Sequence, residues 1–180
     1  QLPKGILNKK STGVGGTFLA ITSKDNYIIA VPTVELIQNK MYQHTGLFGI
    51  YSGIKFSAFK NYIKNNTNYK ILTTYDSLTK TIKWLTDLNL NAYSDFKLLV
   101  DEYHKILNDY SFRDKAINRL LKESLQFDYY TFLSATPINA KFVPKELAAI
   151  DYYEIEWKNT TSVKPIRLKT NKPFLKVVKI

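Results

Sequence analysis

Short apolar segments alternate along this chain with longer segments whose hydrophobic residues have helical spacing. YIIAV (27–31), for example, is apolar, β-branched and short, as buried parallel strands are. It is followed by TVELIQNKMYQ (33–43), which has the pattern of an amphipathic helix. Repetition of this unit predicts an α/β fold with a mostly parallel central sheet covered by helices on both faces. Strands are expected within 5–7, 27–31, 46–52, 69–75, 96–103, 129–136 and 151–157, and helices within 33–43, 53–65, 76–88, 111–127 and after Pro144.

The length and composition agree with one domain of this kind. A chain of 180 residues that is 44% hydrophobic can bury a sizeable core. The absence of cysteine excludes disulfide bonds and cysteine-based zinc sites, and it permits a reducing compartment. No segment approaches the ~18–20 apolar residues of a membrane span. We therefore expect a cytoplasmic, intracellular protein with no membrane partner, and the frequent Lys, Asn, Ile and Tyr suggest an AT-rich bacterial or viral genome.

The net charge of +11 is concentrated near the C-terminus. Residues 158–180 carry seven Lys/Arg and no acidic residue. Such a segment can hold nucleic acid through phosphate contacts, and it can equally be a solvated linker. We therefore divide the chain into a folded domain, residues 1–157, and a basic tail or linker, residues 158–180.

Polar or glycine-rich groups follow five of the predicted strands. They are STGVGGT (11–17), PT (32–33), TTYD (73–76), DEYH (101–104) and SATP (134–137). In a parallel α/β sheet the carboxyl ends of the strands meet at one edge, where ligands bind. Agreement among five separate segments predicts a binding site at that edge more strongly than any single motif does.

The glycine-rich segment has the pattern of a phosphate-binding loop without its lysine. Gly13, Gly15 and Gly16 would let backbone N–H groups surround an anion. Thr17 stands where such loops place a Mg²⁺-binding hydroxyl, whereas Gly16 stands where they place a lysine. Without that lysine, an ordinary glycine-rich turn between a strand and a helix is a strong alternative for this segment taken alone.

Two adjacent carboxylates, Asp101 and Glu102, end an apolar strand. In phosphoryl-transfer enzymes one acid at this place holds Mg²⁺ and a second can orient the attacking water. A solvated acidic pair at a strand end is the alternative. His104 could couple this site to its surroundings by hydrogen bonding, or it could be a surface histidine. Two histidines without cysteine provide no zinc site.

The order of these segments resembles the first RecA-like domain of superfamily-two helicases, which include the DEAD-box, DEAH and SNF2-like ATPases. In that comparison STGVGGT is similar to motif I, PTVEL (32–36) to motif Ia, and TTYDSL (73–78) to motif Ib. DEYH is similar to a DExH form of motif II, and SATP to motif III. The resemblance covers roughly residues 4–157, and PTxEL, DExH and SAT in this order are specific in combination.

The resemblance implies a RecA-like P-loop domain, a three-layer α/β/α sandwich, that binds ATP and Mg²⁺. It also implies DNA or RNA as a partner, together with a second RecA-like domain in cis or in trans. By position, the resemblance implies nucleotide binding by Gly13, Val14, Gly15, Gly16, Thr17 and Phe18, metal binding by Thr17 and Asp101, catalysis by Asp101, Glu102 and His104, nucleic-acid contact by Pro32, Thr33, Thr73 and Thr74, and coupling of nucleotide state to strand movement by Ser134, Ala135 and Thr136.

Three departures from the family pattern bear on activity. Gly16 replaces the motif I lysine, no adenine-reading glutamine motif is recognisable upstream, and the chain ends before a second RecA-like domain. Losing one charged contact to the transition state costs on the order of 10²–10³ in rate. Lys9 or Lys10 could substitute for the missing charge, although both precede the loop on its strand side.

Three hypotheses follow. The preferred one is an ATP-dependent helicase or translocase domain that lacks appreciable turnover alone because half of the composite site is absent. The second is a pseudo-ATPase that binds nucleic acid or assembles with partners without hydrolysis. The third is an unrelated basic α/β domain for acidic partners, which would be favoured if Thr17 and Asp101 lay far apart.

Overall fold

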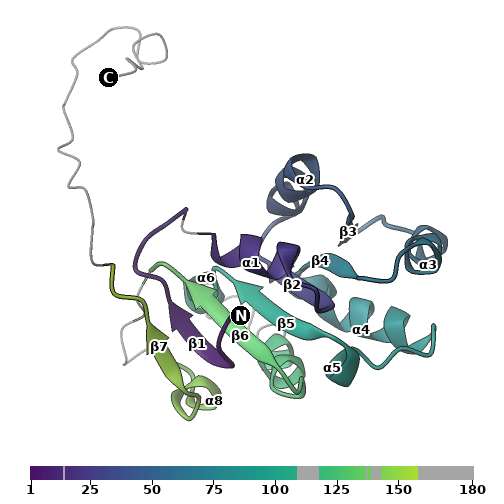
Figure 1. The fold of residues 1–180 in the computed structure, drawn as a ribbon. Coiled ribbons are helices and arrows are strands. Elements are labelled where there is room, and N and C mark those ends of the chain that lie inside the picture. Colours follow the sequence, from purple (N-terminus) through teal and green to yellow (C-terminus); the bar gives the residue numbers. More distant parts are fainter. Residues whose placement is uncertain (14, 109–117, 137, 139–142, 158–180) are drawn as a thin grey trace, which may run out of the picture.

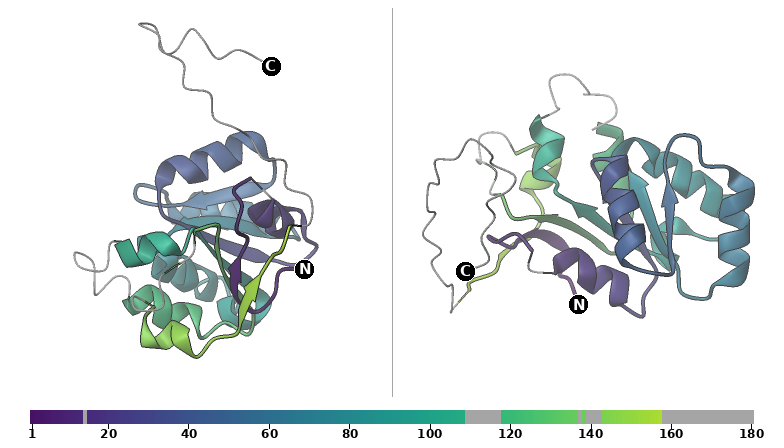
Figure 2. Two further views of the ribbon diagram at one scale, coloured as in Figure 1. Left: turned by 90° about the vertical axis from the view of Figure 1, so that its left-hand side faces the viewer. Right: turned by 90° about the horizontal axis from the view of Figure 1, so that it is seen from above.

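The computed structural model describes residues 1–13, 15–108, 118–136, 138 and 143–157. These residues form a seven-stranded sheet in which every strand pair is parallel, with helices on both faces (Figures 1 and 2). The expected three-layer, RecA-like α/β fold is therefore confirmed. The strands are β1 (Gly5–Asn8), β2 (Tyr27–Val31), β3 (Leu47–Ile50), β4 (Lys70–Thr74), β5 (Lys97–Asp101), β6 (Tyr130–Ser134) and β7 (Tyr152–Glu154).

The strands lie in the order β3-β4-β2-β5-β6-β1-β7. Because all of them are parallel, their carboxyl ends share one edge of the sheet. The ends of β5, β6 and β1 are immediate neighbours there, with Asp101 opposite Leu133 and Asn8 opposite Ser134. The sheet therefore brings the acidic pair, SATP and the glycine loop together, although up to 126 residues separate β1 from β6 in sequence.

The helices largely follow the sequence pattern. The segment predicted at 76–88 begins with a 3₁₀ turn, η1 (Tyr75–Ser77), before the α-helix proper. Of the segment predicted at 111–127, residues 118–124 are described and helical. Two short helices, α5 and α6, were not expected from periodicity. Besides the helix at 118–124, the helices of the described residues are α1 (Gly16–Thr22), α2 (Val34–Gln43), α3 (Phe56–Asn65), α4 (Leu78–Thr86), α5 (Ala92–Asp95), α6 (His104–Asn108) and α8 (Lys145–Ala148).

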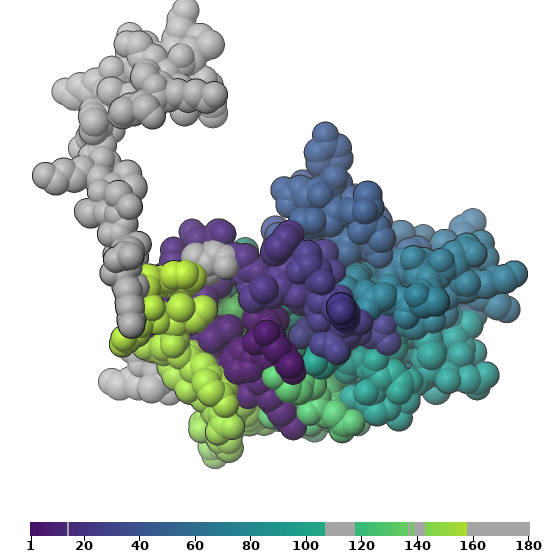
Figure 3. Space-filling view, in the orientation of Figure 1, coloured from purple at the N-terminus to yellow at the C-terminus, as the bar shows by residue number. Residues whose placement is uncertain are grey.

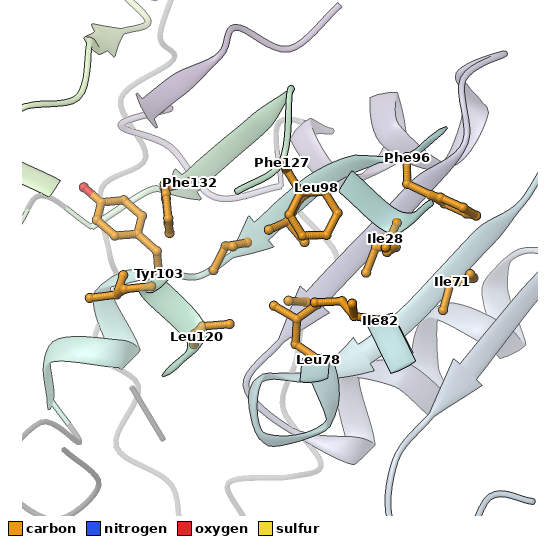
Figure 4. Close-up of a cluster of buried hydrophobic side chains, with 14 of the residues drawn as sticks. Ile28, Ile71, Leu78, Ile82, Phe96, Leu98, Tyr103, Leu120, Phe127 and Phe132 are labelled. Carbon is orange, nitrogen blue, oxygen red and sulfur yellow. The ribbon is translucent and has the colours of Figure 1, made fainter. Parts of the chain in front are cut away.

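Each face of the sheet has its own core, because successive side chains of a strand point to opposite faces. Ile28 of β2 packs with α3, α4 and the helix at 118–124 on one face, part of which Figure 4 shows. Its neighbour Ile29 packs with α1 and α2 on the other face. Strands that are buried on both faces are consistently apolar in sequence, as YIIAV is. Within the described residues, no helix is both long and apolar enough to span a bilayer.

The first strand lies between β6 and the last strand, so the N-terminal residues lie against residues 143–157 (Figure 3). The amide of Ile6 donates to the carbonyl oxygen of Asp151 at 2.8 Å. Gly5 has a φ of 133°, and a Cβ at this residue would lie 2.4 Å from the same oxygen. Only glycine fits at position 5, because the backbone conformation and the nearby Asp151 carbonyl oxygen both exclude a side chain.

Candidate nucleotide-binding site

The loop between β1 and α1 forms one wall of a cavity at the carboxyl edge of the sheet. Gly13 and Gly15 have φ values of 73° and 80°, a left-handed conformation that glycine adopts without strain. Val14 lies outside the described residues. The cavity holds about 340 Å³ and is lined by Lys9, Gly13, Gly15, Gly16, Thr17, Phe18, Val31, Leu36, Lys40, Asp101 and Glu102.

The first residue of the acidic pair meets the threonine of the glycine loop. The Thr17 hydroxyl donates to Asp101 Oδ2 at 2.6 Å, and both side chains are buried. This contact joins residues 84 positions apart. The hypothesis of coincidental motifs would have been favoured by a large separation of these two residues, and the contact argues against it.

A hydroxyl and a carboxylate side by side are hard oxygen ligands of the kind Mg²⁺ prefers. Among the described residues, no group of three or more His, Cys, Asp and Glu side chains is arranged to hold a metal ion. Thr17 and Asp101 could supply the one or two protein oxygens that Mg²⁺ takes at nucleotide sites, where phosphate and water provide the remaining ligands.

Glu102 occupies a left-handed backbone conformation, with a φ of 56°. Such a conformation is uncommon outside glycine, Asn and Asp, and it clusters at functional sites. The Glu102 amide donates to Asp101 Oδ1 at 3.0 Å, which holds the turn. Its carboxylate faces two cationic or titratable groups, with Lys9 Nζ 3.8 Å from Oε1 and His104 Nδ1 3.4 Å from Oε2.

His104 connects the acidic pair to the end of β6. Its Nδ1 lies 2.7 Å from the Ser134 hydroxyl oxygen. That oxygen also accepts from the Thr136 amide at 2.9 Å, and its hydroxyl lies 3.1 Å from the Thr136 carbonyl oxygen. Ala135 lies between them on the same turn. The segments DEYH (101–104) and SATP (134–137) are thus joined by direct contacts of His104 with Glu102 and Ser134.

The predicted nucleic-acid residues lie at the ends of β2 and β4, on the other side of β5 from the glycine loop. Pro32 follows β2, and exposed Thr33 caps α2 by accepting from the Leu36 amide. Thr74 ends β4, is 9% exposed and donates its hydroxyl to Ser77, and Thr73 is fully buried and bonded to Thr81. Of the three threonines, the exposed Thr33 is therefore best placed for a contact with a bound strand.

A direct hydrogen bond joins the residues after β4 to the acidic pair, Asp101 and Glu102. The Tyr75 hydroxyl donates to the Asp101 carbonyl oxygen at 2.5 Å. A residue of the segment that resembles motif Ib, Tyr75, is thus bonded to the main chain of Asp101, whose side chain contacts Thr17.

Position 16 lacks the charge of the expected lysine, and it is also sterically restricted by Leu133. A Cβ at this position would lie 2.6 Å from Cδ2 and 3.3 Å from Cδ1 of Leu133. Leu133 is fully buried on β6, directly beneath the loop. Its side chain occupies the space into which a side chain at position 16 would have to extend.

Two lining residues, Leu36 and Lys40, and one residue outside the lining, Trp157, were not among the predicted site residues. Leu36 and Lys40 lie four positions apart on α2, so helical periodicity alone could have placed them on one face. Trp157, whose indole donates to the Lys9 carbonyl oxygen at 2.8 Å, carries no signal in the sequence because the contact depends on β7 lying beside β1. The basic tail, residues 158–180, lies outside the described residues.

Comparison with known proteins agrees with this geometry. A family model described as DEAD/DEAH box helicase matches residues 9–143. Two solved structures of the DUF1998 helicase MrfA have similar folds. The match to the DNA-bound structure has 17% sequence identity and a TM-score of 0.53, and it covers 84% of this chain and 25% of the MrfA chain. The structure bound to DNA and AMPPNP is 14% identical with a TM-score of 0.54 and covers 85% and 25%.

The chain thus spans a quarter of the length of these helicase chains. No curated protein matches it. The family model covers well over half of the 180 residues, in the segment that contains all five strand-end motifs. The chain belongs to the DEAD/DEAH box helicase family.

Proposed function

We propose that this chain is the nucleotide-binding domain of a helicase or translocase ATPase, with ATP and Mg²⁺ held between the glycine loop and the acidic pair. The observation that carries this proposal is the buried 2.6 Å contact between the Thr17 hydroxyl and Asp101. It places a hydroxyl and a carboxylate on one wall of a cavity whose other wall is a glycine-rich loop. Bound Mg²⁺ would supply charge neutralisation between the phosphates during phosphoryl transfer.

The remaining residues have distinct tasks in this proposal. Glycine-loop amides bind phosphate oxygens, and Thr17 and Asp101 hold the metal. Glu102 orients the attacking water, because its carboxylate lines the cavity beside Asp101. His104 and Ser134 transmit the state of the site to the end of β6 through their 2.7 Å hydrogen bond.

DNA or RNA is the proposed second ligand, bound along the ends of β2 and β4. Thr33 offers an exposed hydroxyl group at the end of β2, and such groups contact the phosphate backbone without reading sequence. The Tyr75–Asp101 bond gives a physical route by which strand binding could alter the nucleotide site. MrfA was solved with DNA, and with DNA and AMPPNP together, which supports testing both ligands at once.

A second RecA-like domain, in cis or in trans, is proposed to complete the site. This chain corresponds to a quarter of the length of the MrfA chains, so an added domain is compatible with the comparison. In composite sites of this family the second domain supplies arginines to the nucleotide. We therefore expect the isolated chain to bind nucleotide with no appreciable turnover.

The test is a calorimetric titration of ATP and ADP with and without Mg²⁺. The wild-type chain should bind ATP in a Mg²⁺-dependent manner, and both Thr17→Val and Asp101→Asn should weaken that binding about tenfold or more, because each removes a metal contact. Thr22→Val is the matched control, because Thr22 lies on the same helix with its hydroxyl bonded to the Phe18 carbonyl oxygen, away from the cavity. Failure of the wild-type chain to bind below millimolar ATP would refute the proposed function.

A further inference from the structure

The cavity contains a buried cation that does not come from the glycine loop. Lys9 follows β1, lines the cavity, and its side chain is only 8% exposed. Its backbone is held at both ends. The amide donates to the Ser134 carbonyl oxygen at 2.8 Å, and the Trp157 indole and the Ser11 amide donate to its own carbonyl oxygen.

The ammonium of Lys9 is poorly matched by the protein around it. Among the described residues its one ion pair is with Glu102, and at 3.8 Å this lies beyond hydrogen-bond distance. An ammonium group has three donors, and the contact with Glu102 is too long to satisfy any of them by a hydrogen bond. Within the described residues, Lys9 thus lines the cavity, is 8% exposed and has only this long ion pair, so its ammonium is placed to donate to an anion in the cavity.

We infer that Lys9 is the phosphate-binding cation of this site and replaces the lysine that is absent at position 16. This inference rests on the proposed function and assigns the charge within it. The glycine at position 16 and the lysine at position 9 are therefore linked: the positive charge absent at position 16 is supplied from position 9. Leu133 occupies the space for a side chain at position 16, while Lys9 brings a positive charge to the same cavity from the strand end. The group recognised is the phosphate chain of a nucleoside triphosphate.

Two other lysines near the site are less suited to this role. Lys10 lies outside the cavity lining, and its Nζ is 2.6 Å from Glu154 Oε2 with 43% of the side chain exposed. Lys40 lines the cavity from α2, but it is only partly buried. Lys9 combines burial, a place in the lining and proximity to Glu102, so it is the cation best positioned for phosphate.

The experiment measures ATP and AMP affinity, each with Mg²⁺, for wild type, Lys9→Met, Lys9→Arg and Lys10→Met. Met keeps an unbranched apolar stem nearly as long as that of lysine and removes the ammonium group. We expect Lys9→Met to weaken ATP binding about tenfold or more, the effect of losing one charge-assisted hydrogen bond. AMP binding should change much less, and Lys9→Arg should recover part of the ATP affinity. Lys10→Met, with the adjacent lysine neutralised, should remain within twofold of wild type.

The outcomes separate this inference from the function on which it rests. Wild-type binding of ATP that Lys9→Met leaves unchanged would overturn the inference alone, whereas no wild-type binding below millimolar would overturn both. Circular dichroism checks the folding of each variant. If the Lys9 variants do not fold, saturating ATP with Mg²⁺ should slow acetylation of Lys9 in the wild-type chain while leaving Lys10 unaffected, as measured by mass spectrometry. An unchanged rate at Lys9 would overturn the inference.

Discussion

Adding a single methyl group at Gly16 should destabilise the protein, although alanine normally favours a helix over glycine. Gly16 begins α1, and its φ is not in the left-handed region, so its backbone tolerates a side chain. The obstacle is Leu133, whose Cδ2 would lie 2.6 Å from the new Cβ. Overpacking of a buried site costs about 1–3 kcal/mol. Relief of glycine's backbone entropy returns at most about 1 kcal/mol, and less at a helix end. We therefore expect Gly16→Ala to lower the free energy of unfolding by about 1–2 kcal/mol.

A double-mutant cycle in urea tests this reasoning. Leu133→Val removes both Cδ atoms and introduces a β-branched side chain that suits a strand. Alone, this shortening should cost about 1 kcal/mol. In its presence Gly16→Ala should cost clearly less than in wild type, with a coupling of about 0.5 kcal/mol or more. Additive effects, or a Gly16→Ala protein more stable than wild type, would show that Leu133 does not limit this position.

The same contact governs attempts to restore the motif I lysine. Gly16→Lys adds a charge near the phosphates, but its Cβ meets Leu133 just as alanine's does. Its ATP affinity therefore has to be compared in the wild-type and Leu133→Val backgrounds. We expect the double variant Gly16→Lys/Leu133→Val to bind ATP more tightly than Gly16→Lys alone, because Leu133 no longer has to move.

Three further changes test other parts of the structure. Gly5→Ala should lower the free energy of unfolding by about 2–4 kcal/mol, because the backbone conformation is strained for alanine and its Cβ would lie 2.4 Å from the Asp151 carbonyl oxygen; urea unfolding equal to wild type would contradict this. Burial lowers the pKa of Lys70 from 10.5 to about 8, so between these pH values the folded chain has lost the Lys70 proton while the unfolded chain still holds it. The free energy of unfolding, relative to that of Lys70→Met, should therefore rise with pH between about 8 and 10.5. A pH-independent difference between the two proteins would exclude that linkage. Trp157→Phe removes the indole bond to the Lys9 carbonyl oxygen and should cost about 1 kcal/mol in the same assay, and no loss would mean that this bond does not fasten β7 to the loop.

The sequence was most informative where strand and helix signals were local. YIIAV (27–31) coincides with β2 residue for residue, because an apolar β-branched run has one stable arrangement when both faces are covered. The order of the strands in the sheet was not predictable in the same way. The pairing of β1 with both β6 and β7 joins opposite ends of the chain, and no local pattern encodes which edges meet. α5 was missed because its four residues are too few to show helical periodicity.

The features of the candidate site likewise differ in whether the sequence could predict them. The meeting of Thr17 and Asp101 was expected, because Asp101 ends one parallel strand, Thr17 lies in the loop after another, and the family order placed them together. The steric role of Leu133 was not, because it depends on the register of β6 beside β1 rather than on any motif.

The contrast between the two adjacent lysines shows what the sequence alone leaves open. Lys10 has a φ of 54°, and its amide donates to Asn8 Oδ1 at 3.0 Å, so the chain makes a left-handed turn directly after the strand. On one side of this turn Lys9 lines the cavity, whereas on the other Lys10 pairs with Glu154 near the surface. That pairing has visible electrostatic consequences, because the hydrogen bond from Lys10 lowers the pKa of Glu154 and raises that of Lys10 itself. One non-glycine residue in an uncommon conformation thus assigns two identical side chains to different environments. A glycine loop without a lysine at position 16 can therefore still have a positive charge beside it, from Lys9, which directly follows the preceding strand.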